Sequence, residues 1–355
     1  MFYRYEVKNN GKEDILYLYL TMNYEFSREL GLKASDKEMK RRCKNFIKNN
    51  GIDFSGNKVY LVIDGIVVKT LDINKEEEIE VLKENLYYSN DYYLVTVKLD
   101  SSAIVEMTLK DYLLGVLATN MIPGLNIEVL KAMCILYRTY AFKEMEEKKV
   151  IDATNNFAIY KPVSYYKLSF APSYDGVIKN LEKAIDDTDC IFNTYDNYYI
   201  LPFIHIANAG RTLSDTRYPY LSQVISLWDY TSPYFVETKK FSYNDLSRIF
   251  KMPIDSKTSV EIMEISPYGK LLKLKIGNTI IDGRNLLKKL NLKSLYINII
   301  MNKENILFIS MGWGEFLGLS MYGANELAKN GCDYANILKY YFPKTKLKKY
   351  IKELS

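Results

Sequence analysis

The chain has 355 residues, of which 48% are hydrophobic and 26% are charged, a balance typical of a folded protein with a substantial core. Its net charge of +5 is too small to require nucleic acid or an anionic membrane, so we expect no nucleic-acid partner. The single histidine, His205, excludes zinc sites and acid–base mechanisms that need two histidines. Its four cysteines are dispersed and form no CxxC pair, which predicts free thiols.

The first ninety residues predict a small α/β accessory domain, to which we assign no function. A helix is expected from Ser35 to about Lys48, and Asp64-Gly65 is a strong signal for a hairpin turn. Strands are expected at residues 2–7, 15–20, 59–63 and 66–71. Residues 1–14 contain no apolar stretch like that of a secretory signal, which favours a cytoplasmic location.

From residue 91 onward strand pairs alternate with longer helices, which predicts a second domain over residues 91–355 and an α+β fold for the chain. Thr108 and Asn126 are expected to cap two helices, and the second helix is apolar on several sides, as in a buried central helix. Pro202 should either break the strand predicted at Tyr198–His205 or confine it to the edge of a sheet. Other strands are expected at residues 93–99, 103–107, 260–266, 271–280 and 306–311, and a last helix at 324–330. No stretch is long and apolar enough for a transmembrane segment.

Three motifs stand out in this second part. Residues 109–121 read LKDYLLGVLATNM and are followed by IEVLKA and YRTYA; residues 205–212 read HIANAGRT; and residues 312–324 read GWGEFLGLSMYGA. In this order they resemble motifs of the SpoIID/LytB family, which contains stage II sporulation protein D and its amidase-enhancer relatives. The resemblance extends over about residues 92–345 and leaves the first ninety residues uncovered.

The resemblance implies a protein that acts on peptidoglycan outside the cytoplasmic membrane, and the sporulation member is similar to a lytic transglycosylase. Such an enzyme needs a carboxylic acid that protonates the glycosidic oxygen. At the position of the family's glutamate this chain has Asn120, whose amide has no transferable proton near neutral pH. Met133 and Met321 replace family glutamines, and Glu315 replaces a histidine. The chain therefore lacks the inherited acid.

We expect a binding cleft between Asn120, residues 205–212 and residues 312–324. Its candidate residues are Asn120, His205, Asn208, Arg211, Thr212, Trp313, Glu315, Ser320 and Tyr322. Trp313 and Tyr322 could stack on sugar rings or simply pack in the core. Glu315 is either a relocated acid or a carboxylate that faces solvent or a lysine, and His205 is either a structural histidine or a general base.

The family's Cys/His metal pair has no counterpart between Lys143 and Gly176, so we expect no zinc and no other cofactor. Three functions remain open. The leading hypothesis is a catalytically degenerate sporulation or cell-wall protein that binds a peptidoglycan glycan strand or a protein partner. The second is an active lytic transglycosylase that uses Glu315, and the third is a cytoplasmic regulatory protein that reuses the fold. The location of the protein is open in the same way. The family resemblance implies an extracytoplasmic or cell-wall location, whereas residues 1–14 show no export signal and favour the cytoplasm.

Overall fold

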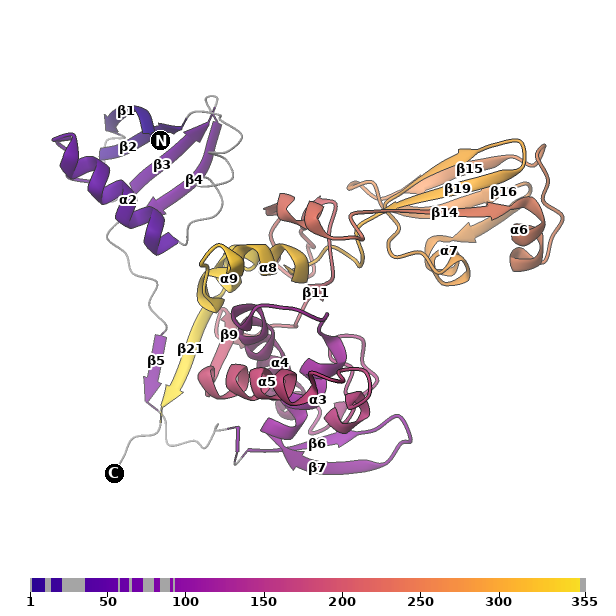
Figure 1. Cartoon of the computed structure of the whole chain (residues 1–355), viewed down its shortest axis with the longest axis horizontal. Helices are drawn as coiled ribbons and strands as arrows, with labels where there is room; N and C mark the ends of the chain where they lie inside the picture. The colour runs from indigo at the N-terminus through magenta and orange to yellow at the C-terminus, as the bar shows by residue number, and fades with distance from the viewer. Residues whose placement is uncertain are drawn as a thin grey trace.

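The computed structural model describes residues 2–9, 14–20, 36–56, 58–63, 66–72, 80–83, 90–91 and 93–351. Within these ranges the fold is α+β, as the sequence predicted, with helices packed among several small sheets (Figure 1). Buried apolar side chains form three larger clusters, one between Leu16 and Leu61, one between Val95 and Phe342, and one between Tyr243 and Phe308. The third cluster lies within the sequence limits of the second, in a part of the chain for which the sequence suggested no core of its own.

The N-terminal sheet has the order β1-β2-β3-β4. Its strands β1 (Phe2–Asn9) and β2 (Asp14–Leu20) are antiparallel, as are β3 (Lys58–Ile63) and β4 (Ile66–Asp72), so both predicted strand pairs are confirmed. β2 and β3 run parallel, and α2 (Asp36–Asn49) lies in the crossover connection that parallel strands require. The predicted cap Ser35 and the turn Asp64-Gly65 lie outside the described residues.

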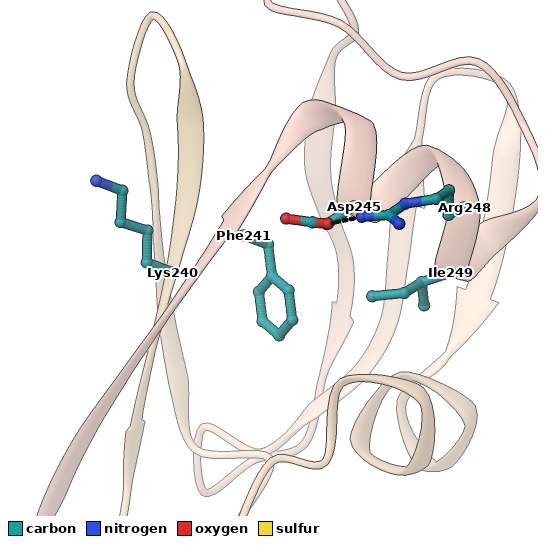
Figure 2. A pocket seen from close by; sticks show the side chains of 5 residues that line it. All are labelled: Lys240, Phe241, Asp245, Arg248 and Ile249. Carbon is teal, nitrogen blue, oxygen red and sulfur yellow. Dashed lines mark hydrogen bonds and ion pairs between the residues drawn. The ribbon is translucent and has the colours of Figure 1, made fainter.

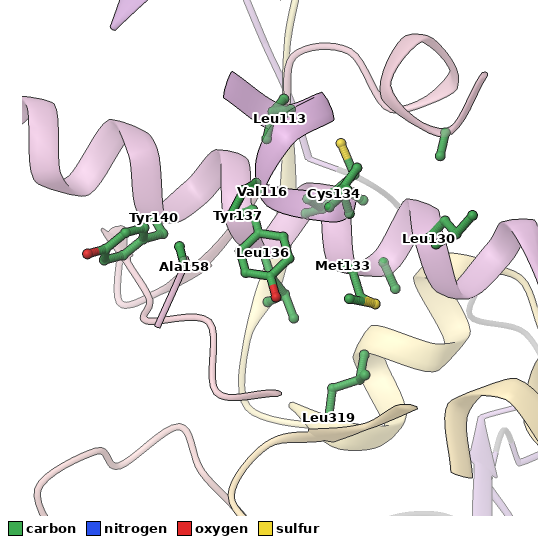
Figure 3. Packing of buried hydrophobic residues seen from close by; sticks show 14 of the residues in the cluster. Leu113, Val116, Leu130, Met133, Cys134, Leu136, Tyr137, Tyr140, Ala158 and Leu319 are labelled. Atoms are coloured by element: carbon green, nitrogen blue, oxygen red, sulfur yellow. The ribbon is translucent and has the colours of Figure 1, made fainter. Parts of the chain in front are cut away.

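The central part begins with the antiparallel pair β6 (Leu94–Lys98) and β7 (Ile104–Thr108). Helix α3 (Leu109–Asn120) follows directly, and the Thr108 side chain accepts a hydrogen bond from the Asp111 backbone N–H, which confirms the predicted cap. Asn126 likewise caps α4 (Ile127–Glu147) through the Glu128 N–H. Helix α4 is the centre of the largest cluster, which includes Met133, Leu136 and Tyr137 of the helix together with Leu319 (Figure 3).

The buried side chain of Arg138 links α4 to the elements that pack beside it. The Arg138 guanidinium donates hydrogen bonds to the backbone carbonyls of Ile185, Thr188 and Ile191, at the C-terminal end of α5 (Tyr174–Asp187) and the start of β9 (Ile191–Tyr195). Its Nε also donates to Asn90 Oδ1, at 3.0 Å. Because the last carbonyls of a helix are the negative end of its dipole, they stabilise this buried cation.

The last described residues, 321–351, complete the central part of the chain. Helices α8 (Met321–Lys329) and α9 (Tyr334–Tyr341) pack on α4. Strand β21 (Lys346–Ile351) then lies between β9 and β5 (Glu80–Lys83), in a sheet of order β10-β9-β21-β5. The strand predicted at 198–205 is broken at Pro202, as expected, and leaves β10 (Tyr198–Tyr199) and β11 (Ile204–His205). Short elements complete this part, namely β8 (Ile151–Asp152) and η2 (Val163–Tyr166).

Residues 236–311 form the orange lobe of Figure 1 around the third cluster. One sheet has the order β14-β19-β18 and the other the order β15-β16-β17. The single strand predicted at 271–280 is wrong, because a turn at Gly277, with φ of +56°, divides it into a hairpin. The elements are β14 (Val236–Ser242), α6 (Tyr243–Phe250), β15 (Val260–Ile265), β16 (Leu271–Ile276), β17 (Thr279–Asp282), α7 (Gly283–Leu290), β18 (Ile297–Met301) and β19 (Asn305–Met311).

Candidate functional site

The second and third motifs lie side by side. Strand β11 pairs in parallel with β20 (Leu319–Ser320), so that His205 lies opposite Ser320. Single bridges continue the contact from Ala207 to Trp313 and from Leu213 to Leu317. We call residues 204–213 and 313–323 together the central seam. Two segments that are more than a hundred residues apart in the chain thus bring together most of the candidate residues.

His205 is buried in the central seam. Its Nδ1 lies 3.0 Å from the Leu317 carbonyl oxygen, which can only accept, so Nδ1 must hold the ring proton. Its Nε2 is buried without a hydrogen-bond partner among the described residues. Burial lowers the pKa of the imidazole to about 4, although the bond to Leu317 opposes this shift. The ring is therefore neutral at pH 7, and its free nitrogen faces no exposed surface.

A glycine keeps the seam closed around this ring. Gly314 has a φ of +121°, and a β-carbon added there would lie 2.7 Å from the β-carbon of His205. Both the backbone angle and the space therefore require glycine at this position. Gly314, in the first half of the third motif, thus allows the backbone of that motif to pack against His205.

Asp229 is the polar centre of the seam, and the sequence did not single it out. It lies in the short helix η3 (Leu227–Thr231) and is fully buried. The Asn208 backbone N–H and side-chain amide donate to its two oxygens at 3.0 and 2.9 Å, and Ser226 Oγ donates at 2.6 Å. The Ser320 hydroxyl is a further donor. One buried carboxyl thereby joins the second motif, η3 and the third motif.

Burial raises the pKa of Asp229 to about 6, while the hydroxyl and amide donors act in the opposite direction. Since Ser226 gives its proton to Asp229, the Tyr341 hydroxyl, 2.9 Å from Ser226 Oγ, must donate to Ser226. A β-carbon on Gly323 would lie 2.7 Å from Asp229 Oδ2. The glycine of the third motif therefore makes room for this network. The network is satisfied within the protein and presents no surface to a ligand.

Asn208 and Thr212 are buried and use their side chains locally. Asn208 Oδ1 accepts from the Gly210 N–H at 2.7 Å, and Thr212 Oγ1 accepts from the Val224 N–H and donates to the Ser222 carbonyl, both at 3.0 Å. Arg211 is different, because it is exposed on β12 (Gly210–Arg211), opposite Ile225 of β13 (Ile225–Ser226). Arg211 is thus the second motif's side chain most open to a ligand.

Trp313 and Tyr322 belong to an aromatic group at the edge of the seam. The Trp313 ring meets Tyr234 edge to face, with centroids 4.5 Å apart, and Tyr234 lies 6.4 Å from the Tyr322 ring. The Lys293 ammonium lies 3.8 Å from the Trp313 ring centroid, in cation–π contact. A sugar that stacks on this face of Trp313 would first have to displace Lys293.

Glu315 lies outside the buried network. Its carboxylate is exposed and pairs with the Lys270 ammonium, in the turn between β15 and β16. Of the two interpretations of Glu315, this contact corresponds to the carboxylate paired with a lysine. The Glu315 carboxylate therefore lies at the surface, outside the hydrogen bonds that join the second and third motifs.

Asn120, at the end of α3, makes its contacts away from the seam. Its side-chain N–H groups donate to the carbonyl oxygens of Val116, at 2.6 Å, and Ile159, at 2.7 Å. Both amide protons are therefore used in fastening the loop around residue 159 to the helix. The described contacts bring His205, Asn208 and Ser320 together, but they join Asn120 to none of the other candidates.

The described residues contain no group of three or more His, Cys, Asp or Glu side chains that could hold a metal ion. Cys43, Cys134, Cys190 and Cys332 form no disulfide bond in the described structure. Among the described helices, none combines the length and the apolar character that a membrane crossing needs.

Asp229 was missed in the sequence analysis. An acid in the run Leu227-Trp228-Asp229-Tyr230 resembles a residue in a helix turn at the surface. The signal that could have identified it as a buried carboxyl is that it is an isolated acid among apolar residues.

Comparison with known proteins agrees with the three motifs. Residues 98–195 match the family model SpoIID, stage II sporulation protein. The chain is 28% identical to stage II sporulation protein D of Bacillus subtilis (strain 168) over 261 residues, 70% of this chain and 76% of that protein. It is 27% identical to the protein of the same name from Bacillus amyloliquefaciens, over 68% of this chain and 74% of that one. It is also 29% identical to the amidase enhancer of Bacillus subtilis (strain 168) over 117 residues, 33% of this chain and 13% of that protein.

Proposed function

Because this chain belongs to the SpoIID family, we propose that it acts in sporulation or the cell wall as a module that binds peptidoglycan glycan strands without cleaving them. The observation that supports the proposal is the state of Asn120. It occupies the position of the family's acid, and both of its amide protons are bound to backbone carbonyls. No proton is available there for a glycosidic oxygen.

A replacement acid has little support among the other candidates. Glu315 is exposed and its carboxylate is paired with the Lys270 ammonium. Asp229 has a pKa near neutral, but it is fully buried and its oxygens are occupied by four donors from the protein. The proposal of a non-cleaving protein rests on these surroundings together with Asn120.

Binding would use the side chains of the central seam that solvent reaches, which are the exposed Arg211 and the half-buried Trp313 and Tyr322. Arg211 offers a cation for anionic groups of the wall, and the Trp313 and Tyr322 rings offer faces for sugars once Lys293 has moved. A binding role for these residues needs no group in the buried network to change its hydrogen bonds. The buried network would then act as the support that holds the exposed residues in place.

The test is incubation of the purified protein with intact peptidoglycan and with glycan strands stripped of their peptides. Protein retained in the pellet measures binding, and mass spectrometry of the supernatant measures anhydro products. We expect retention without products. Arg211→Ala should reduce retention severalfold, while Lys179→Ala, which removes an exposed lysine from α5, should leave it unchanged.

Two further variants separate the alternatives. Glu315→Gln should change neither retention nor products, and Asn120→Glu should release no products, because Met133 and Met321 fill the positions of the family's polar residues in the core. Anhydro products from the unmodified protein that vanish in Glu315→Gln would contradict the proposal and identify Glu315 as the acid. Absence of retention on both materials would contradict glycan binding.

A further inference from the structure

A pocket lies in the lobe formed by residues 236–311, outside the SpoIID motifs. It has a volume of about 520 Å³ and is lined by Lys240, Phe241, Asp245, Arg248 and Ile249 (Figure 2). Lys240 and Phe241 belong to β14, and the other three residues belong to α6. We call this feature the edge groove, because it lies between one strand and the helix that follows it.

The lining residues place the groove at the C-terminal end of β14, beside α6. Successive side chains of a strand point to opposite faces of its sheet. Phe241 points toward the core and meets Phe308 of β19 edge to face, with centroids 5.8 Å apart, so Lys240 must point to the opposite face. The pocket is therefore lined by residues from both faces of the sheet, near the point where β14 leads into α6.

That edge is unpaired. β14 pairs residue by residue with β19, from Val236 opposite Met311 to Ser242 opposite Asn305. In the sheet order β14-β19-β18, the strand has no second neighbour within the described residues. Alternate residues of β14 thus direct their N–H and C=O groups away from β19, to the open edge beside which the groove begins. Another extended backbone has the donors and acceptors, at the same spacing, that would satisfy them.

The side chains around the edge groove combine an apolar floor with positive charge. Phe241 and Ile249 are half-buried and lie on either side of the pocket, as Figure 2 shows. Lys240 is exposed, and Asp245 is already paired with Arg248. The Lys289 ammonium donates to the Ile249 carbonyl, at 3.3 Å, and adds a further cation at the end of α6. The surroundings therefore favour a ligand with negative charge and one apolar group.

We propose that the edge groove binds an extended acidic segment of a partner protein, which adds as a strand to β14. An apolar side chain of the segment enters the space between Phe241 and Ile249, and its acidic neighbours lie near Lys240 and Arg248. A glycan would fit less well, because it has no alternating backbone donors and acceptors for the strand edge. This inference goes beyond the proposed function, since it uses another surface and a protein ligand.

The probes are fluorescein-labelled peptides that alternate Glu with Val, Leu or Phe, and a matched peptide in which Lys replaces every Glu. Fluorescence anisotropy with the full chain measures binding. We expect saturable binding of at least one acidic peptide and none of the lysine peptide. The variant Lys240→Glu/Arg248→Glu should weaken binding by on the order of tenfold or more, since both changes reverse charge at the groove. The control Lys179→Glu makes the same type of change on α5 and should bind as the unmodified protein does.

Hydrogen exchange distinguishes strand addition from general electrostatic attraction. The bound peptide should slow exchange of the free-edge amides in residues 236–242, and a peptide with proline at alternate positions should lose this protection. The proposal is overturned if no acidic peptide binds, if the double variant binds as tightly as Lys179→Glu, or if binding leaves exchange in β14 unchanged. Circular dichroism of each variant establishes that it is folded before binding is compared.

Discussion

The central seam and the edge groove use polar groups in opposite ways. In the seam, Asp229 receives four hydrogen bonds from protein donors, and His205 and Ser320 are buried beside it. In the groove, the backbone edge of β14 has no strand partner among the described residues and Lys240 extends into solvent. The resemblance directs attention to the seam, but the groove has the backbone groups that no described strand pairs. Buried motif residues such as His205 and Ser320 thus serve packing, whatever the exposed residues of the chain do.

The largest expected effect comes from filling the seam. Gly323→Ala should lower the free energy of unfolding by about 3 kcal/mol or more, because its β-carbon would lie 2.7 Å from Asp229 Oδ2 in a closed network. Gly176→Ala is the matched control, since a β-carbon there meets nothing within 4 Å, and it should raise stability by a few tenths to about 1 kcal/mol. Urea unfolding of both variants measures the difference. Equal effects would contradict the description of the seam as tightly filled.

The second prediction uses the two shifted pKa values in the seam. The His205 pKa falls from 6.5 to about 4 on folding, so the unfolded chain binds more protons in this range and stability rises with pH. The Asp229 pKa rises from 3.8 to about 6, so stability falls with pH over nearly the same range. Each shift corresponds to about 3 kcal/mol, and the two nearly cancel in the unmodified protein.

Asp229→Asn removes one of these opposing contributions. The stability of this variant should rise between pH 4 and 6.5 more steeply than that of the unmodified protein, by about 3 kcal/mol across the range. Urea unfolding at four pH values measures the two slopes. The change of slope is independent of any constant cost of the substitution. Parallel curves would contradict the burial of these two groups.

A third, smaller effect is expected at the end of α3. Asn120→Asp replaces an amide donor with a carboxylate that faces the Val116 and Ile159 carbonyl oxygens, so its pKa should rise on folding. The variant should lose about 1–3 kcal/mol at pH 7.5 and less at pH 4, where the carboxyl is protonated and can donate one bond. Unfolding at the two pH values measures this difference. A loss that is equal at both would mean that residue 120 does not face these carbonyls.

The smallest effect is expected at Glu315. Its pair with Lys270 is exposed, and Glu315→Gln should change the free energy of unfolding by less than about 0.5 kcal/mol. The change should shrink further at 1 M salt, which screens exposed charges. Thermal unfolding at low and high salt measures it. A large loss that persists at high salt would show that Glu315 belongs with the buried network of the seam and not with the surface.

Local features such as helix caps could be predicted from the sequence. Contacts between segments far apart in the chain could be predicted only through the family resemblance. Thr108 and Asn126 were identified as caps because a cap depends on a few neighbouring residues. Pro202 was identified as a strand break for the same reason. Asp229 was missed, since its burial depends on Asn208 and Ser320, which only the fold brings to it. The free edge of β14 was missed because pairing partners cannot be inferred from the composition of one strand.

The pairing of β21 with β9 also has a consequence for the order of synthesis. Thr194 and Lys346 touch across this pair, although 152 residues separate them in the chain. A ribosome that adds roughly 5–20 residues per second needs on the order of 10 to 30 seconds to make the intervening segment. The lobe of residues 236–311 can fold from its own contacts in that interval, whereas β9 waits with an open edge until the later strand emerges. Nascent chains should therefore pass through a state in which the later-made lobe is complete before the earlier-made centre.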